Sequence, residues 1–200
     1  MWKPLNHRIT QWHGRRVWVV GASSGIGAAL AQALLQAGAR VVLSARSASG
    51  LAQVAAGHPL AEVLPLDVTD ATAWAQAAHT LQQQGAAPDL VVFCAAVYRP
   101  QHSWELQADE VAYTLQTNLA GVYYGLQAVL PGMRTHGHGG VAIVASVAGY
   151  VGLPGAAVYG PTKAALINLA ELLYSELHPQ GLDVYLVNPG FVQTRLTARN

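Results

Sequence analysis

The chain has 200 residues, which is enough for one domain with a substantial core and typical of a single α/β unit. Its formal net charge is +1 and it contains no basic run or stripe, so we expect neither nucleic acid nor an acidic membrane surface as a partner. Hydrophobic residues make up 52% of the chain and charged residues only 10%, which predicts that a second subunit covers part of the surface.

Six short apolar runs predict six β-strands. They lie at residues 17–20, 40–44, 61–66, 90–94, 141–146 and 182–188. Each run is almost continuously hydrophobic, which is typical of strands covered on both faces. Ala- and Leu-rich stretches predict helices near residues 25–37, 48–56, 70–85, 107–134 and 160–178. This alternation predicts an α/β fold, a Rossmann-like doubly wound parallel β-sheet with helices on both faces in three α/β/α layers.

No linker, repeat or low-complexity block divides the chain, so we expect an N-terminal arm over residues 1–13 and a single domain over residues 14–200. Two segments resemble export or membrane signals. They are the apolar stretch after Arg15-Arg16 and the uncharged residues 139–162. Gly and Ser interrupt the first and Gly and Pro the second, so we predict no export signal and no transmembrane segment.

The first predicted strand is followed by GASSGIG, residues 21–27, and then by a helix. Gly21 would let the chain turn sharply, Gly25 would let a diphosphate approach the backbone, and Gly27 would let the helix pack closely. Free N–H groups at the helix start would face the anion. The spacing differs from the G-x-G-x-x-G dinucleotide fingerprint and from the P-loop, so the turn alone also fits a plain tight turn.

The second predicted strand ends in Ser44, Ala45 and Arg46, without a carboxylate. An acidic residue here would hydrogen-bond a ribose 2′-hydroxyl, whereas an arginine accommodates a 2′-phosphate. The strand end therefore favours NADP(H) over NAD(H). The alternative is that Arg46 is an ordinary solvated surface cation.

Lysine occurs only twice, and Lys163 stands four positions after Tyr159. At this spacing both side chains lie on one face of a helix, and Pro161 predicts that the helix begins nearby. A free phenol has a pKa of about 10, and a neighbouring ammonium favours the phenolate. Tyr159 could then give a proton to a carbonyl oxygen or take one from an alcohol. By itself, the Y-x-x-x-K pattern also occurs by chance on surface helices.

These motifs occur together with four others in a fixed order. The others are Asp67 after the third strand, Asn118 in TNLAG, Ser146 in VASVAG, and the late NPGFVQT. From about residue 14 to the end, the set resembles the short-chain dehydrogenase/reductase family in order and spacing. The resemblance implies that residues 14–200 form a Rossmann-type dinucleotide-binding catalytic domain.

The resemblance also implies a role for each matching residue. Tyr159 would be the general acid/base. Lys163 would bind the nicotinamide ribose and lower the pKa of Tyr159, Ser146 would hydrogen-bond the substrate oxygen, and Asn118 would hold a water of a proton relay. The implied cofactor-binding residues are Gly21, Ser23, Ser24, Gly25, Ile26, Gly27, Arg46, Asp67, Val68, Ala95, Tyr159, Lys163, Pro189, Gly190, Val192 and Thr194. Taken singly, Ser146 also fits a turn residue, Asn118 a mid-helix polar residue, and Asp67 a helix cap.

The chain departs from the family pattern at two places. Where the family usually has Asn-Asn-Ala-Gly, this chain has Phe93-Cys94-Ala95-Ala96, which predicts a narrower adenosine side of the pocket. Family members usually continue well beyond the position of Asn200, so three alternatives stay open: the chain is a fragment, it lacks a disordered tail, or it is a minimal form. If the C-terminal substrate segment is absent, we expect the sixth strand to lie at an exposed edge. We expect Cys94 to be a small core residue. As the single cysteine it cannot form an internal disulfide, which fits a cytoplasmic location.

We predict an NADPH-dependent oxidoreductase that reversibly reduces a ketone or aldehyde to an alcohol. Two alternatives stay open: an NAD-dependent alcohol dehydrogenase of the same family, and a non-catalytic nucleotide-binding or scaffold protein. The residues expected near the substrate, Tyr98, Gly149, Tyr150 and Phe191, are apolar or aromatic, which favours a small hydrophobic carbonyl or alcohol compound.

Two further predictions concern assembly and metals. By resemblance, the long helices around Asn118 and Lys163 would pair with their copies across a two-fold axis, which predicts a homodimer and makes a tetramer doubtful. His136 and His138 lie in a Gly-rich loop with no acid or cysteine close by in sequence. This pattern is more typical of a connection than of a ligand set, so no metal is expected.

Overall fold

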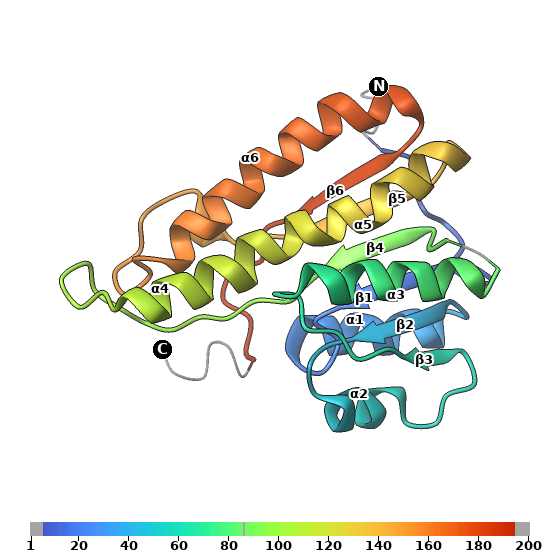
Figure 1. Cartoon of the computed structure of the whole chain (residues 1–200), viewed down its shortest axis with the longest axis horizontal. Helices are drawn as coiled ribbons and strands as arrows, with labels where there is room; N and C mark the ends of the chain where they lie inside the picture. The colour runs from blue at the N-terminus through green and yellow to red at the C-terminus, as the bar shows by residue number, and fades with distance from the viewer. Residues whose placement is uncertain (1–5, 86, 195–200) are drawn as a thin grey trace.

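The computed structural model describes residues 6–85 and 87–194, and Figure 1 shows how its elements are arranged. Six parallel strands form one sheet in the order β3-β2-β1-β4-β5-β6. The strands are β1 (Arg16–Val20), β2 (Arg40–Ser44), β3 (Ala61–Val63), β4 (Leu90–Phe93), β5 (Gly140–Val144) and β6 (Asp183–Val187). The order reverses between β1 and β4, which is where ligands bind in sheets of this kind.

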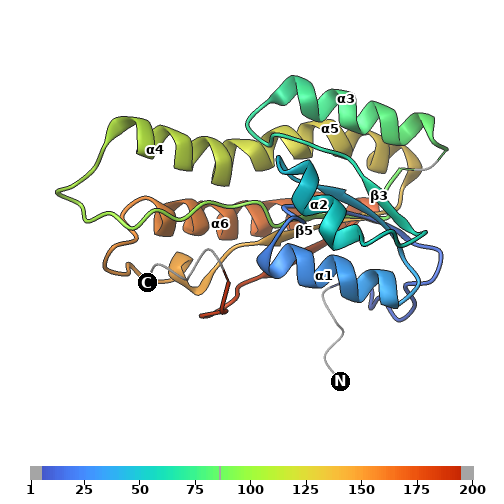
Figure 2. The same cartoon turned by 90° about the horizontal axis from the view of Figure 1, so that it is seen from below.

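Helices cover both faces of the sheet, as Figures 1 and 2 show. They are α1 (Gly25–Gln36), α2 (Ala48–Ala55), α3 (Ala71–Gln83), α4 (Ala108–Leu115), α5 (Gly121–His136) and α6 (Tyr159–Leu177). The core on one face joins the strands to α3, α5 and α6, and the core on the other face joins them to α1 and α2. The predicted Rossmann-like three-layer fold is confirmed.

Neighbouring residues of each strand enter opposite cores because successive side chains of a strand point to opposite faces. In β1, Trp18 and Val20 belong to the core under α3, α5 and α6, while Val17 and Val19 belong to the core over α1 and α2. All four are 1% exposed or less. This double burial explains why the strand sequences are continuously apolar.

Two predicted elements differ more than the others from those of the structure. The strand expected over residues 61–66 ends at Val63. The N–H groups of Leu64 and Leu66 still donate to the carbonyl oxygens of Leu43 and Ala45, so the chain follows β2 beyond the end of β3. The helix expected over residues 107–134 is divided into α4 and α5 by a π-helical turn at Gln116–Ala120. Such turns are frequent at functional sites, and this one contains Asn118.

The segment before β1 covers part of the sheet edge that was expected to be exposed. The Asn6 side chain donates from Nδ2 to the carbonyl oxygen of Val184 (2.8 Å), and its Oδ1 accepts from the Val184 N–H (3.1 Å). The Tyr185 hydroxyl donates to the carbonyl oxygen of His7 (2.9 Å). The Asn6 side-chain amide therefore bonds the backbone of Val184 in β6 as a neighbouring strand would.

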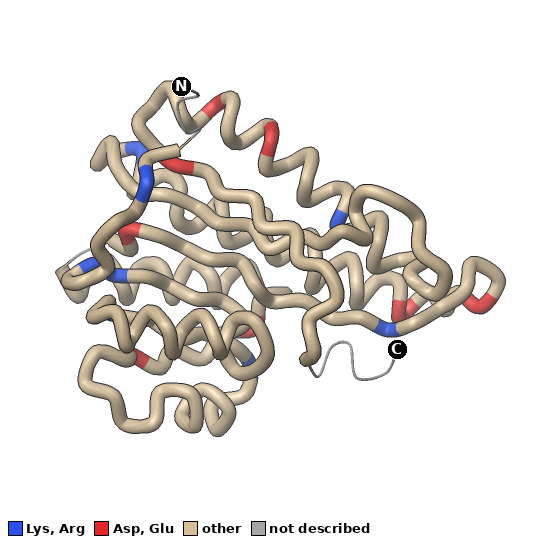
Figure 3. The backbone as a smooth tube through the Cα atoms, turned by 180° about the vertical axis from the view of Figure 1, so that it is seen from behind, with Lys and Arg blue, Asp and Glu red and all other residues tan. Residues whose placement is uncertain are grey.

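Charged residues are spread thinly over the fold. Figure 3 shows the Lys, Arg, Asp and Glu positions scattered along the tube without a stripe of one sign. No helix in the described ranges is long and apolar enough to cross a membrane.

Candidate active site

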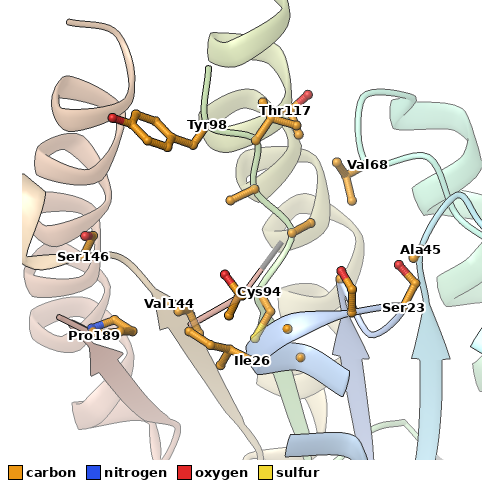
Figure 4. A pocket seen from close by; sticks show the side chains of 18 of the residues that line it. Ser23, Ile26, Ala45, Val68, Cys94, Tyr98, Thr117, Val144, Ser146 and Pro189 are labelled. Atoms are coloured by element: carbon orange, nitrogen blue, oxygen red, sulfur yellow. The ribbon is translucent and has the colours of Figure 1, made fainter. Parts of the chain in front are cut away.

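A cavity of about 520 Å³ opens beyond the carboxyl ends of the strands. Figure 4 shows Tyr98, Ser146 and Pro189 toward one side of it and Ala45 and Val68 toward the other. The predicted site residues that line the cavity are Gly21, Ser23, Ser24, Gly25, Ile26, Gly27, Arg46, Val68, Ala95, Ser146, Tyr159, Lys163, Pro189, Gly190, Val192 and Thr194. The folded chain therefore brings together sixteen of the eighteen predicted residues.

The two remaining residues, Asp67 and Asn118, do not line the cavity but support segments that do. Asp67 accepts hydrogen bonds from the backbone N–H (3.0 Å) and the hydroxyl (2.8 Å) of Thr69. Burial acts to raise the pKa of Asp67, but these hydrogen bonds and the charge of Arg46 lower it below its ordinary value. Asp67 is not the cap of the next helix, because Asp70 accepts from the first N–H groups of α3.

The glycine turn connects β1 to α1 and forms part of the cavity wall. Gly21 has a φ of +95°, and a Cβ added to it would lie 2.5 Å from the Ala95 backbone nitrogen. Gly25 has a φ of +57°, but a Cβ there would meet only the Thr194 side chain, at 3.3 Å. Ser24 is the N-cap residue of α1, and its side chain makes no capping hydrogen bond. The turn thus excludes side chains at Gly21 and presents a helix start, with its uncapped N–H groups, to the cavity.

Tyr159 is the first residue of α6, and its ring centroid lies 4.9 Å from that of Tyr98. Burial raises the pKa of Tyr159, a hydrogen bond with the Ser146 side chain acts to lower it, and Tyr98 acts to raise it. The net pKa is above the ordinary value. The lowering that was expected from Lys163 is not seen, because desolvation of the phenol outweighs the groups that favour its charged form.

Lys163 lies one turn further along α6 and is only 2% exposed. Its Nζ donates to the carbonyl oxygen of Val144 (2.9 Å) and lies 5.5 Å from the centroid of the Tyr159 ring. Burial lowers the pKa of Lys163 to about 8, while Cys94 acts to raise it. Burial also raises the pKa of the Cys94 thiol to about 12, although Lys163 acts to lower it. A neutral thiol therefore faces the ammonium, in keeping with the expectation that Cys94 is not a nucleophile.

Asn118 is fully buried and all its polar atoms have partners in the protein. Its Oδ1 accepts from the Val97 N–H (2.7 Å), and its Nδ2 donates to the Val97 carbonyl oxygen (2.9 Å) and to the Thr162 hydroxyl (3.3 Å). These bonds tie the segment after β4 to α6 through the π-helical turn. The relay role of Asn118 stays a prediction.

Sequence reasoning missed three polar residues of the cavity wall, Ser47, Arg99 and Thr117. Thr117 is 6% exposed and its hydroxyl has no hydrogen-bond partner among the described residues. The only available signal was its place beside Asn118 in TNLAG. Both residues belong to the π-helical turn, which the sequence did not predict, and only Thr117 lines the cavity.

The substrate side of the cavity is only partly as expected. Tyr98 lines the cavity, but Gly149, Tyr150 and Phe191 do not. Tyr150 is 65% exposed and Phe191 is 84% exposed, so both present apolar surface to solvent. The His136 and His138 rings lie 6.0 Å apart, and no group of three or more His, Cys, Asp or Glu side chains could hold a metal ion within residues 6–85 and 87–194.

The chain is similar to known oxidoreductases over most of its length. A family model described as short chain dehydrogenase matches residues 15–200. An uncharacterized oxidoreductase of Myxococcus xanthus is 36% identical over 190 residues, which cover 93% of this chain and 75% of the relative. A short-chain dehydrogenase structure from Streptomyces avermitilis has a TM-score of 0.86 and 33% identity, covering 92% of this chain and 68% of that one. A gluconate 5-dehydrogenase from Burkholderia cenocepacia, in complex with NADP and tartrate, has a TM-score of 0.88 and 27% identity, covering 94% and 76%.

Proposed function

The chain belongs to the short-chain dehydrogenase family, and from this premise we propose that it reversibly reduces a ketone or aldehyde to an alcohol with NADPH. The observation that carries the proposal is the placement of Tyr159, Ser146 and Lys163 at one cavity whose wall also contains the glycine turn and Arg46. A proton-transfer group, an oxygen-binding hydroxyl and an anion-binding turn are the parts that carbonyl reduction with a dinucleotide requires.

The residues present fit a nicotinamide dinucleotide. The space around Gly25 is open except for the Thr194 side chain, so a diphosphate could approach the backbone there. Arg46 forms no ion pair with any described carboxylate and is thus available to a 2′-phosphate. A bound NADP in the Burkholderia cenocepacia neighbour supports the same cofactor choice. The glycine turn, Val68 and Lys163 would hold the rest of the molecule.

The chemistry is divided between the cofactor and the protein. When bound, the nicotinamide supplies the hydride. The raised pKa keeps the Tyr159 phenol protonated at neutral pH, which is the state needed to give a proton to the carbonyl oxygen. The Ser146 hydroxyl would hold that oxygen beside the phenol, and Lys163 would bind the nicotinamide ribose.

Calorimetric titration with NADPH and NADH, followed by a screen of hydrophobic ketones and aldehydes, tests this proposal. We expect tighter binding of NADPH and consumption of NADPH with at least one carbonyl compound. Tyr159→Phe should lower turnover by a factor of more than about 10³ and leave NADPH binding within about twofold, because only the transferable proton is lost. A fully active Tyr159→Phe variant would refute the mechanism. NADH preference would favour the dehydrogenase alternative, and binding of neither nucleotide a non-catalytic protein.

We also propose that the protein forms a homodimer and is located in the cytoplasm. Leu115 in α4, Tyr123 in α5 and Leu172 in α6 are between 42% and 51% exposed, which supports coverage of these helices by a second copy. Light scattering should then give twice the mass of one chain.

A further inference from the structure

Two arginines from distant segments contact one tyrosine ring beside the cavity. Arg46 follows β2, Arg99 lies between β4 and α4, and Tyr113 belongs to α4. The guanidinium carbon of Arg99 lies 4.9 Å from the centroid of the Tyr113 ring, and that of Arg46 lies 5.8 Å from it. Arg46 and Arg99 both line the cavity, so we call these three residues its rim. Both distances are within the range in which a guanidinium is attracted to an aromatic face.

The two arginines are held differently. Arg99 forms an ion pair with Glu110, which lies one helical turn before Tyr113 on the same face of α4. Arg99 is thus fixed by two groups of one helix and its charge is balanced. Arg46 has no such carboxylate among the described residues, although its charge helps to lower the pKa of Asp67. Within residues 6–85 and 87–194, the guanidinium of Arg46 forms no ion pair and lies against the ring of Tyr113.

An exposed arginine without a partner samples many rotamers, and binding an anion then costs the entropy of fixing it. A ring that already holds the guanidinium at the cavity reduces this cost. A ring carries no charge, so it leaves the arginine free to pair with phosphate, as a carboxylate in its place would not. The arrangement therefore prepares Arg46 for an anion.

We propose that Tyr113 is a positioning residue for the 2′-phosphate of NADP(H), acting through Arg46, and that it contributes to discrimination against NAD(H). This inference rests on the proposed function, because it assumes that Arg46 meets the 2′-phosphate. The hydroxyl of Tyr113 has no part in it. Any aromatic ring at this position serves, and an aliphatic side chain of similar size does not.

The test compares dissociation constants for NADPH and NADH in five proteins: the wild type, Tyr113→Leu, Tyr113→Phe, Arg46→Leu and Trp104→Leu. Trp104→Leu is the matched control, because it removes a 78% exposed aromatic side chain that does not line the cavity. We expect Arg46→Leu to abolish the preference for NADPH. We expect Tyr113→Leu to weaken NADPH binding about threefold, the effect of one exposed cation–π contact, with NADH binding unchanged. Tyr113→Phe and Trp104→Leu should match the wild type.

The outcomes separate the inference from the proposed function. A wild type without preference for NADPH, or an Arg46→Leu variant that keeps the preference, would overturn the cofactor proposal and this inference with it. If Arg46→Leu loses the preference but Tyr113→Leu keeps it in full, the role of Tyr113 alone is wrong. Equal weakening of both nucleotides in Tyr113→Leu would show a merely structural role and also overturn the inference. Melting temperatures of all five proteins identify any variant that fails to fold.

Discussion

The floor and the rim of the cavity are held by different forces. At the floor, Gly21 and Lys163 lie directly against the backbone of neighbouring segments, and so does Asn118, which supports the floor from behind without lining the cavity. Asn118 and Lys163 are at most 2% exposed, so their hydrogen bonds to carbonyl oxygens and N–H groups are formed away from water. At the rim, Arg46, Arg99 and Tyr113 meet through solvent-accessible side chains. Groups without an alternative partner are costly to remove, while groups that can turn to water are not.

This difference shows that the residues around one cavity can have separate roles: some stabilise the folded protein and others contribute mainly to ligand binding. We expect substitutions at the floor to lower the free energy of unfolding strongly, and substitutions at the rim to change ligand affinity with little loss of stability. Each of the following predictions tests that division.

The largest effect is expected from the two glycines of the turn. Gly21→Ala should destabilise the protein by more than about 3 kcal/mol, because the new Cβ would overlap the Ala95 backbone at a positive φ. Gly25→Ala should cost only about 1–2 kcal/mol of stability, for its left-handed backbone, and weaken NADPH binding more than tenfold by filling the open space. Chemical unfolding and calorimetry measure both. Equal stability losses in the two variants would contradict the division.

The second prediction concerns pH and Lys163, whose pKa falls from 10.5 to about 8 on folding. Between these values the unfolded chain binds a proton that the folded chain does not, so this residue's destabilising contribution is full below pH 8 and fades as the pH rises toward 10.5. Relative to Lys163→Met, the wild type should gain stability by up to about 1.4 kcal/mol per pH unit in this window.

Chemical unfolding of both proteins at pH 7, 8, 9 and 10 checks this slope. The Cys94 thiol has the opposite effect, because its pKa rises from 9.0 to about 12 on folding and stability is lost above pH 9. Both proteins should therefore carry Cys94→Ala, which removes that titration. A stability difference that does not vary with pH would show that Lys163 stays charged in the folded protein.

Thr117 is expected to be an exception among the buried residues of the cavity, because its hydroxyl has no partner among the described residues. Thr117→Val keeps the shape and removes the unpaired group, so we expect it to raise the free energy of unfolding by about 1 kcal/mol. Differential unfolding against the wild type measures the gain, with Thr80→Val on the exposed side of α3 as control. Destabilisation by Thr117→Val would mean that the hydroxyl has a partner in solution.

The smallest effect is expected at the rim. Arg99→Gln removes an ion pair whose side chains are 46% and 24% exposed, and such pairs contribute about 0.2–1 kcal/mol. We expect a stability loss in the lower half of that range, which increased salt should diminish. A loss above about 2 kcal/mol would place Arg99 with the floor residues rather than the rim.

The sequence by itself determined the sheet, the glycine turn and the order of the site residues. Its signals are local: apolar runs covered on both faces, a turn only glycine can make at Gly21, and a tyrosine and a lysine one helical turn apart. Such signals depend on backbone sterics and side-chain periodicity, which act over a few residues. They predicted the glycine turn, Arg46, Tyr159 and Lys163 at the cavity, whereas the resemblance to a known family supplied the other predicted residues that line it.

Only the tertiary structure decided the pKa values and the contacts that depend on residues far apart in the sequence. The pKa of Tyr159 is raised rather than lowered, because burial by the assembled core outweighs the groups that favour the phenolate. Asn6 pairs with Val184, 178 positions away, and Tyr113 meets Arg46 across the cavity mouth. Desolvation and contacts of this kind are set only when both sides of the sheet are packed, so no spacing along the chain encodes them.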